Sequence, residues 1–315
     1  MAYSKEMKIF CGGGSDSLTS RVCAHIGIPQ GAAHVERFSD GEIHVQLGEN
    51  VRGKDVFIIN STSPPVNDHL VELLILIDAA RRASAARVTA VLPYFGYARQ
   101  DRKDRPRVPI TAKLVSNLIV AAGAHRVLTV DLHCDQLQGF FDIPVDHLSG
   151  EVVFVKHLMS RNLENIVVVS PDTGSVNRAR QVANRIEAPL AIVDKRRAKA
   201  NVSEVMNVIG EVKGMRALIL DDLIDTAGTL VRAAKAIKDK GATEVIACGT
   251  HAVFSGAAVQ LIQDSVLDEI IVSDSIPLRP EAVACSKIST VSFAPLIGEA
   301  IKRIHDEESI SILFS

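Results

Sequence analysis

The stretch DDLIDTAGT, Asp221 to Thr229, places three carboxylates at the end of an apolar strand and directly before a turn of small residues. The preceding RALIL, residues 216–220, is a short apolar run typical of a buried strand. The following LVRAAKAIKDKG carries apolar residues at helical spacing and ends at Gly241. The sequence therefore predicts a strand, a tight turn and a helix in immediate succession.

A turn at the N-terminus of a helix is suited to binding a phosphate, because its backbone N–H groups are unpaired and the helix dipole favours negative charge. The residues that could supply such N–H groups and two hydroxyls are Thr226, Ala227, Gly228 and Thr229. The acceptors suited to vicinal sugar hydroxyls, or to a metal, are Asp221, Asp222 and Asp225. The motif fits a sugar phosphate.

An ordinary strand-to-helix turn with threonine as the helix cap is the alternative interpretation of this stretch. Gly228 and Thr229 alone would fit it. The adjacent acids Asp221 and Asp222 favour the ligand site, since a buried strand seldom ends in two carboxylates without a partner for them.

Composition is that of a globular protein. The chain has 315 residues, of which 47% are hydrophobic, so it can bury a full core and form two domains. The most apolar run, LVELLILIDAA, is interrupted by Glu72 and Asp78, and no secretory signal precedes the first predicted strand. We therefore expect a cytoplasmic protein without a membrane partner.

Cysteine usage and charge exclude several functional classes. The five cysteines are odd in number and never spaced as CxxC, so neither a disulfide framework nor a zinc knuckle is expected. The formal net charge of −2 argues against nucleic acid as a partner, because no basic excess is available to neutralise phosphates.

Short apolar runs alternate with amphipathic segments along almost the whole chain, which predicts parallel sheets covered by helices. The predicted strands lie in KIF, DVFIIN, RVTAVLPYF, RVLTVDL, NIVVVSPD, PLAIVDK, RALILDD, EVIACGTH and EIIVSDS. They form two groups separated near DIPVDHLSG, whose turn residues precede a new helix. We expect domains at 1–148 and 149–315, with a C-terminal helix and tail that could pack back on the first domain.

The segment PYFGYARQDRKDRPRVP, Pro93 to Pro109, is aromatic and then highly charged. A solvated charged face is one interpretation. However, the segment follows the strand RVTAVL and so lies beyond the carboxyl edge of the sheet, where open α/β folds bind ligands. Arg99 and Gln100 could contact a nucleotide there, since a guanidinium can stack on a base or bind a phosphate.

DDLIDTAGT resembles the ribose-phosphate motif of type I phosphoribosyltransferases, and PYFGYARQDRK is similar to the signature of the ribose-phosphate pyrophosphokinase family. The resemblance extends over essentially the full chain and points to the common phosphate-dependent class. It implies an α/β fold of two type I phosphoribosyltransferase-like domains, each a mainly parallel sheet flanked by helices. The second domain would carry the ribose 5-phosphate site.

The activity implied by the resemblance is transfer of the β,γ-diphosphoryl group of ATP to the C1 hydroxyl of ribose 5-phosphate. The products would be AMP and 5-phosphoribosyl 1-pyrophosphate, which serves nucleotide, histidine and tryptophan biosynthesis. The implied ribose 5-phosphate ligands are Arg197, Asp221, Asp222, Asp225, Thr226, Ala227, Gly228 and Thr229.

The resemblance also assigns an ATP site. RFSDGE, residues 37–42, is similar to the family's adenine-binding stretch, which reaches the base from a neighbouring subunit. Without the resemblance, this stretch would be an ordinary turn before the strand EIHVQL. The implied ATP-binding residues are Phe38, Asp40, Gly41, Glu42, Arg99 and Gln100.

Magnesium is the implied metal, with His133 and Asp172 as the associated residues. Each follows a predicted strand, and Mg²⁺ needs few protein ligands because it keeps phosphate oxygens and waters. DTGS, residues 172–175, occupies the position of the family's pyrophosphate loop. Ser175 stands where the family has a second glycine, and serine disfavours positive φ.

DKRRAKANV, residues 194–202, resembles the family's mobile catalytic loop, with Lys195 and Arg197 as the implied catalytic cations. A solvated basic loop is the alternative. The resemblance further implies activation by inorganic phosphate, inhibition by ADP and a homohexamer built from dimers. The implied allosteric residues are Arg52, Ser309 and Ser311.

Three other functions compete with this interpretation. An ordinary phosphoribosyltransferase would share DDLIDTAGT but would be shorter and lack FSDGE, PYFGYARQDRK and the KRR loop. A non-catalytic paralogue would typically lose catalytic residues, and only Ser175 favours it. A metal-dependent hydrolase is weaker still, because no compact His and carboxylate cluster appears at ligand spacing.

Overall fold

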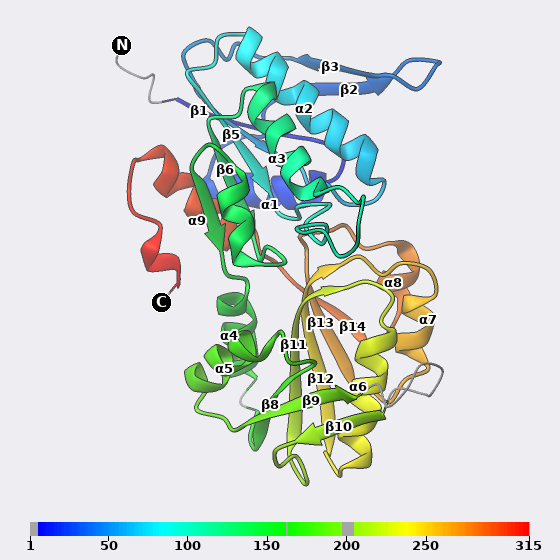
Figure 1. Cartoon of the computed structure of the whole chain (residues 1–315). Coiled ribbons are helices and arrows are strands. Elements are labelled where there is room, and N and C mark those ends of the chain that lie inside the picture. Colours follow the sequence, from blue (N-terminus) through cyan, green and yellow to red (C-terminus); the bar gives the residue numbers. More distant parts are fainter. Residues whose placement is uncertain (1–5, 162, 197–204, 315) are drawn as a thin grey trace. The chain divides into compact units, whose positions relative to one another are not determined.

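The computed structural model describes residues 6–161, 163–196 and 205–314. Contacts divide the chain into two compact units (Figure 1). Unit 1 extends to Gly150 and also contains Ser275–Pro277 and the C-terminal segment from Ser292. Unit 2 consists of Glu151–Asp274 and Leu278–Val291. The C-terminal helix therefore folds with the N-terminal half of the sequence.

Unit 1 is built on a five-stranded parallel sheet in the order β1-β4-β5-β6-β7. The strands are β1 (Met7–Cys11), β4 (Asp55–Ile59), β5 (Arg87–Leu92), β6 (Arg126–Val130) and β7 (Val145–Leu148). A separate antiparallel hairpin joins β2 (Ala33–Arg37) to β3 (Ile43–Leu47). The helices are α1 (Asp16–Ile26), α2 (Val66–Arg82), α3 (Thr111–Ala122), η1 (Asp135–Phe140), α9 (Ala294–His305) and η2 (Ser311–Phe314).

The central strands of this sheet are buried on both faces, as expected when helices cover both sides of a parallel sheet. Every residue of β4 is buried. Helix α2 buries Leu73, Leu76, Ile77 and Ala80 against the sheet at helical spacing. Helices α1 and α9 pack against each other, so the C-terminal helix completes this unit.

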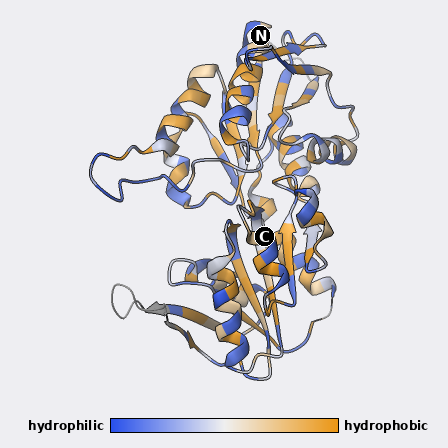
Figure 2. Cartoon of the chain, turned by 90° about the vertical axis from the view of Figure 1, so that its right-hand side faces the viewer, coloured by the Kyte–Doolittle hydropathy of each residue, from blue (hydrophilic) through white to orange (hydrophobic). Residues whose placement is uncertain are grey.

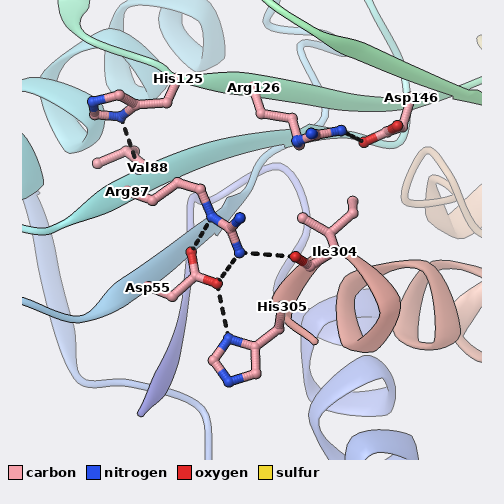
Figure 3. Close-up of polar contacts among 8 residues, drawn as sticks. All are labelled: Asp55, Arg87, Val88, His125, Arg126, Asp146, Ile304 and His305. Atoms are coloured by element: carbon pink, nitrogen blue, oxygen red, sulfur yellow. Dashed lines mark hydrogen bonds and ion pairs between the residues drawn. The ribbon is translucent and has the colours of Figure 1, made fainter. Parts of the chain in front are cut away.

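Helix α9 is anchored by its C-terminal end to the beginning of β4 and β5 (Figure 3). Two nitrogens of the Arg87 guanidinium bind the Asp55 carboxylate: Nε donates to Oδ1 at 2.8 Å, and Nη2 donates to Oδ2. Nη2 also donates to the Ile304 carbonyl at 2.9 Å. His305 Nδ1 lies 2.8 Å from Asp55 Oδ2. An arginine fork can bind a carboxylate and a helix carbonyl together because its donors are fixed in one plane.

Unit 2 is built on a seven-stranded sheet in the order β10-β9-β8-β11-β12-β13-β14, parallel except for β10. The strands are β8 (Ile166–Ser170), β9 (Leu190–Arg196), β10 (Val205–Ile209), β11 (Arg216–Ile224), β12 (Glu244–Ala252), β13 (Glu269–Ser273) and β14 (Ile288–Val291). The helices are α4 (Glu151–Ser160), α5 (Val176–Arg185), α6 (Gly228–Asp239), α7 (Ala258–Gln263) and α8 (Pro280–Ala284).

Helix α6 shows why this sequence forms these elements. It buries Leu230, Ala233, Ala234 and Ile237 on one face against the sheet and leaves the charged Lys235 exposed. In Figure 2 the strands of the sheets are mostly hydrophobic, whereas helices carry both hydrophobic and hydrophilic residues. This distribution is that of buried strands beneath amphipathic helices.

The predicted fold class is confirmed, and each of the nine predicted strands is observed. One segment differs from the prediction. DIPVDHLSG is not only a turn, because Val145–Leu148 pairs with β6 as the edge strand β7 and Arg126 Nη1 binds Asp146 Oδ2 at 2.6 Å (Figure 3). The segment contains proline, aspartates and a histidine, which are not typical of a buried strand, and here polar contacts stabilise the strand. No helix within the described ranges has the length and hydropathy needed to span a bilayer.

Candidate active site

The acid pair lies near the C-terminal end of β11, where the side chains alternate between the two faces of the sheet. The backbone N–H of Asp222 donates to Oδ1 of Asp221 at 3.0 Å. The Asp222 carboxylate pairs with Arg178 on α5, at 3.5 Å from Nη1. Asp222 is 9% exposed. The two carboxyl groups are thus adjacent but differently surrounded.

The surroundings of Asp221 disfavour its charge. Burial, followed by the negative charge of Asp222, raises the pKa of Asp221 to about 8, while Arg178 acts in the opposite direction. A carboxyl group with such a pKa is protonated at neutral pH and can donate as well as accept a hydrogen bond. The acid pair can therefore both donate a hydrogen bond to a hydroxyl group and accept one from it.

The small-residue turn after β11 has a backbone suited to anions. Ala227 takes a left-handed conformation, φ 59°, and the helix α6 begins at the next residue, Gly228. A left-handed residue beside a right-handed one turns successive N–H groups toward a common point, which forms an anion-binding concavity. Because a non-glycine residue in this conformation costs roughly 1 to 2 kcal/mol, the turn holds strain of the kind found at ligand sites.

The DTGS loop follows β8 at the same carboxyl edge of the sheet. Asp172 Oδ1 accepts the N–H groups of Gly174 and Ser175 at 3.0 and 2.9 Å. Ser175 has φ −91°, which serine adopts without strain. The serine in place of the family's glycine therefore does not distort this loop.

Sequence reasoning missed two charged residues beside the acid pair. Arg178 Nη1 lies 3.5 Å from Asp222 Oδ1, and Arg178 Nε lies 3.5 Å from Glu151 Oε1. A signal was present: Arg178 precedes Val182 by four residues, so an arginine occupies the buried stripe of α5.

The predicted catalytic loop begins in a β-hairpin. Lys195 belongs to β9, where its backbone pairs with Met206 of the antiparallel β10. Arg197 lies outside the described residues.

His133, assigned to the metal, is exposed in a turn after β6. The turn begins with Asp131 at φ 40°, an uncommon conformation for a non-glycine residue. Two hydrogen bonds hold it: Gly150 N–H donates to Asp131 Oδ1 at 3.1 Å, and Leu132 N–H donates to His147 Nε2 at 2.9 Å. Cys134, the next residue, has a pKa raised to about 11 by burial and by Asp101, and is not a reactive thiolate.

The residues assigned to ATP lie on two exposed segments of unit 1. The turn from Phe38 to Glu42 closes the β2–β3 hairpin, with Gly41 at φ 93° and Asp40 Oδ1 accepting the Glu42 N–H at 3.0 Å. Phe38 is 53% exposed. Its ring centroid lies 5.3 Å from that of His44 on β3.

Arg99 and Gln100, the other residues assigned to ATP, are exposed after β5. Thr111 donates to Gln100 Oε1 at 2.5 Å, which directs the Gln100 amide nitrogen away from this contact.

The residues assigned to allostery lie at two places in unit 1. Arg52 Nη1 donates to Ser84 Oγ at 3.2 Å. Ser309 donates to Ser311 Oγ at 3.0 Å just before η2, and the Ser309 carbonyl accepts from Arg303 at 3.1 Å. These serines therefore lie on a tail that is tied back to α9.

Metal ligands can be tested only within the described part of the chain. There, no group of three or more His, Cys, Asp and Glu side chains is arranged to hold a metal ion by itself. A magnesium ion that relied on protein ligands alone has no site among these residues.

Two family models match this chain. The family model for the N-terminal domain of ribose phosphate pyrophosphokinase matches residues 7–123, and the phosphoribosyl synthetase-associated domain matches residues 197–315. A ribose-phosphate pyrophosphokinase of Caldanaerobacter subterraneus is 56% identical and covers 99% of both chains. That of Corynebacterium ammoniagenes is 53% identical over 99% of this chain and 98% of its own.

Among solved structures, the phosphoribosylpyrophosphate synthetase of Mycobacterium smegmatis superposes with a TM-score of 0.90. It is 37% identical and covers 96% of this chain and 99% of its own. Sheets, helices and strand-end loops thus define an α/β protein with two phosphoribosyltransferase-like domains. The chain belongs to the ribose-phosphate pyrophosphokinase family.

Proposed function

We propose that this chain transfers the β,γ-diphosphoryl group of ATP to the C1 hydroxyl of ribose 5-phosphate, giving 5-phosphoribosyl 1-pyrophosphate and AMP. The observation that carries the proposal is the end of β11, where an acid pair precedes a left-handed Ala227 and the N-terminus of α6. Hydroxyl acceptors and an anion-binding turn at this spacing fit a sugar phosphate. Family membership over the whole chain supports the same activity.

The reaction needs no nucleophile from the protein. The oxygen of the sugar's C1 hydroxyl attacks the β-phosphorus in line, the bond from that phosphorus to the bridging oxygen of AMP breaks, and the hydroxyl proton is lost. Positioning and charge stabilisation are what the protein contributes to such a transfer. Asp221 and Asp222 would bind ribose hydroxyls, and Lys195 with Arg197 would stabilise the charge that develops on the phosphoryl oxygens.

The 5-phosphate would occupy the turn Asp225–Thr229. Its negative charge would be opposite the N–H groups at the beginning of α6, where the helix dipole is favourable. Binding there would also offset the strain of the left-handed Ala227.

Magnesium is the metal that the family resemblance implies, and His133 and Asp172 would be its protein contacts. Because Asp172 Oδ1 already accepts two loop N–H groups, the protein alone offers a weak site, which is the usual pattern when Mg²⁺ is bound largely by substrate phosphates and water. The ion, when bound, supplies positive charge that neutralises the phosphates.

We further propose that Phe38, Asp40, Gly41 and Glu42 bind the adenine of ATP bound to a neighbouring subunit, together with Arg99 and Gln100. This arrangement requires a homo-oligomer, which we expect to be a homohexamer built from dimers. We also propose that Arg52, Ser309 and Ser311 bind inorganic phosphate as an activator or ADP as an inhibitor. We also propose that the protein is cytoplasmic and that the boundary between its two domains lies in the sequence between residues 148 and 149.

A product assay tests the activity. Purified protein is incubated with ribose 5-phosphate, ATP and magnesium, with and without inorganic phosphate, and AMP and 5-phosphoribosyl 1-pyrophosphate are quantified. We expect the two products in equal amounts and a requirement for phosphate. Folded protein that forms no AMP under either condition would be the non-catalytic paralogue instead. Ser175, the only feature favouring that paralogue, has an unstrained φ of −91°.

A further inference from the structure

A partly buried arginine, Arg178, connects the acid pair to two helices of unit 2. The Arg178 guanidinium lies between Asp222 of β11 and Glu151, the first residue of α4, at 3.5 Å from a carboxylate oxygen of each. The side chains are 23% (Arg178), 10% (Glu151) and 13% (Asp222) exposed. Two acids and one base thus lie together, largely shielded from water, and one of the acids belongs to the candidate ribose site.

Such a triad requires a physical reason, because taking charges out of water costs more than a weakly placed pair returns. Apolar side chains of similar volume would often stabilise the fold as well or better. A guanidinium has a feature that they lack: its planar donors hold two carboxylates in a fixed relation. The triad is therefore better explained by the positions in which it holds the two carboxylates than by a contribution to the stability of the fold.

The geometry that Arg178 fixes is that of the acid pair. Asp222 is held from two sides, by its carboxylate at Arg178 and by its N–H at Oδ1 of Asp221. The two contacts lie on adjacent residues of β11, so the Asp222 carboxylate that Arg178 orients is next to the Asp221 carboxyl group. Arg178 also lies in the first turn of α5, which directly follows the loop in which Asp172 accepts the N–H groups of Gly174 and Ser175.

We propose that Arg178, braced by Glu151, is a positioning residue for the sugar: it sets the orientation of the Asp222 carboxylate and so the spacing of the hydroxyl acceptors at the end of β11. The inference rests on the proposed function. It implies that the residue controls ribose 5-phosphate recognition without contacting it, and that ATP recognition is independent of it.

The test compares Arg178→Met, which keeps the length and removes the charge, with Arg178→Lys, which keeps the charge. Arg180→Met is the matched control, since Arg180 is exposed on the same helix. We expect Arg178→Met to raise KM for ribose 5-phosphate at least tenfold and to leave KM for ATP within twofold. Arg178→Lys should recover part of the loss, and Glu151→Gln should shift KM in the same direction by less.

Calorimetric binding of ribose 5-phosphate to the same variants separates this inference from the proposed function. A wild-type protein without turnover overturns the proposed function, whereas selective loss of sugar affinity in Arg178→Met still supports the positioning role. Equal KM and equal affinity in Arg178→Met and wild type would overturn it, as would a parallel rise in both KM values. If Arg178→Met does not fold, Arg178→Lys and Glu151→Gln decide: unchanged KM for ribose 5-phosphate in both rejects the inference.

Discussion

The backbone N–H of Asp222 binds Oδ1 of Asp221 at 3.0 Å, and this contact joins two carboxyl groups with different electrostatic surroundings. Asp222 faces the Arg178 guanidinium, whereas burial and the charge of Asp222 raise the pKa of Asp221 to about 8. A site for sugar hydroxyls therefore contains two adjacent acids, one paired with a guanidinium and one whose raised pKa favours the protonated form.

This asymmetry predicts how stability depends on pH. An unfolded Asp221 loses its proton near pH 3.8, its unperturbed pKa, whereas the folded protein keeps the proton until about pH 8. Between these values the folded state binds more protons than the unfolded state, so Asp221 lowers the free energy of unfolding as pH rises. Asp221→Asn should therefore stabilise the ligand-free protein at pH 7 by more than about 1.4 kcal/mol, the value of a single pKa unit.

Urea unfolding of ligand-free Asp221→Asn and wild type at several pH values between about 4 and 10 measures this effect, because this range extends beyond the folded pKa of Asp221. The stability difference should grow with pH and level off above pH 8. Asp239→Asn, which changes an exposed acid on α6, should give no comparable slope. A constant difference between Asp221→Asn and wild type would show that Asp221 ionises normally in the folded protein.

Much of this site could be predicted from the sequence because its signals are local. Asp221 to Thr229 encodes strand, turn and helix within nine residues, and the structure has β11 ending at Ile224 and α6 beginning at Gly228. The partners of Arg178 could not be assigned in this way, because its ion pairs with Glu151 and Asp222 join segments far apart in the chain. The strand β7 was missed for a related reason: its residues become a strand only by pairing with β6.

Lys195 is expected to act on the chemical step. Lys195→Ala should reduce kcat by about 10² to 10³, or about 2.7 to 4 kcal/mol, by analogy with other donors to developing negative charge. The measurement is AMP formation at saturating ATP and ribose 5-phosphate, together with urea unfolding.

Unfolding should be nearly unchanged in Lys195→Ala, since the effect is on the transition state. Lys156→Ala, which removes an exposed lysine of α4 in the same unit, should retain full turnover. Turnover in Lys195→Ala close to that of wild type would reject Lys195 as a catalytic cation.

Arg87 should be important for stability rather than for catalysis. Arg87→Ala leaves the Asp55 carboxylate, only 8% exposed, without its guanidinium and removes the donor to the Ile304 carbonyl (Figure 3). Removing one partner of a buried ion pair costs roughly 3 to 5 kcal/mol, because the remaining charge stays buried. We expect a loss of this size in the free energy of unfolding.

Arg82→Ala provides the matched control for Arg87. Arg82 binds Asp78 within α2, but its side chain is 79% exposed, and exposed pairs contribute about 0 to 1 kcal/mol. If both variants lose the same small amount of stability, α9 is not anchored through Arg87.

Gly150 is expected to hold the turn that carries His133. A Cβ at this position would lie 2.6 Å from both Asp131 Oδ2 and Phe293 Cζ, which is closer than real Cβ contacts occur. Gly150→Ala must therefore displace Asp131, Phe293 or both, and Asp131, with φ 40°, begins the His133 turn. We expect a cost of roughly 1 to 3 kcal/mol. Because His133 moves with the turn, AMP formation should fall as well.

Gly139→Ala, where no atom lies within 4 Å of the new Cβ, should change neither stability nor turnover. If the Gly150→Ala protein loses stability but keeps full turnover, the position of this turn is not important for the reaction.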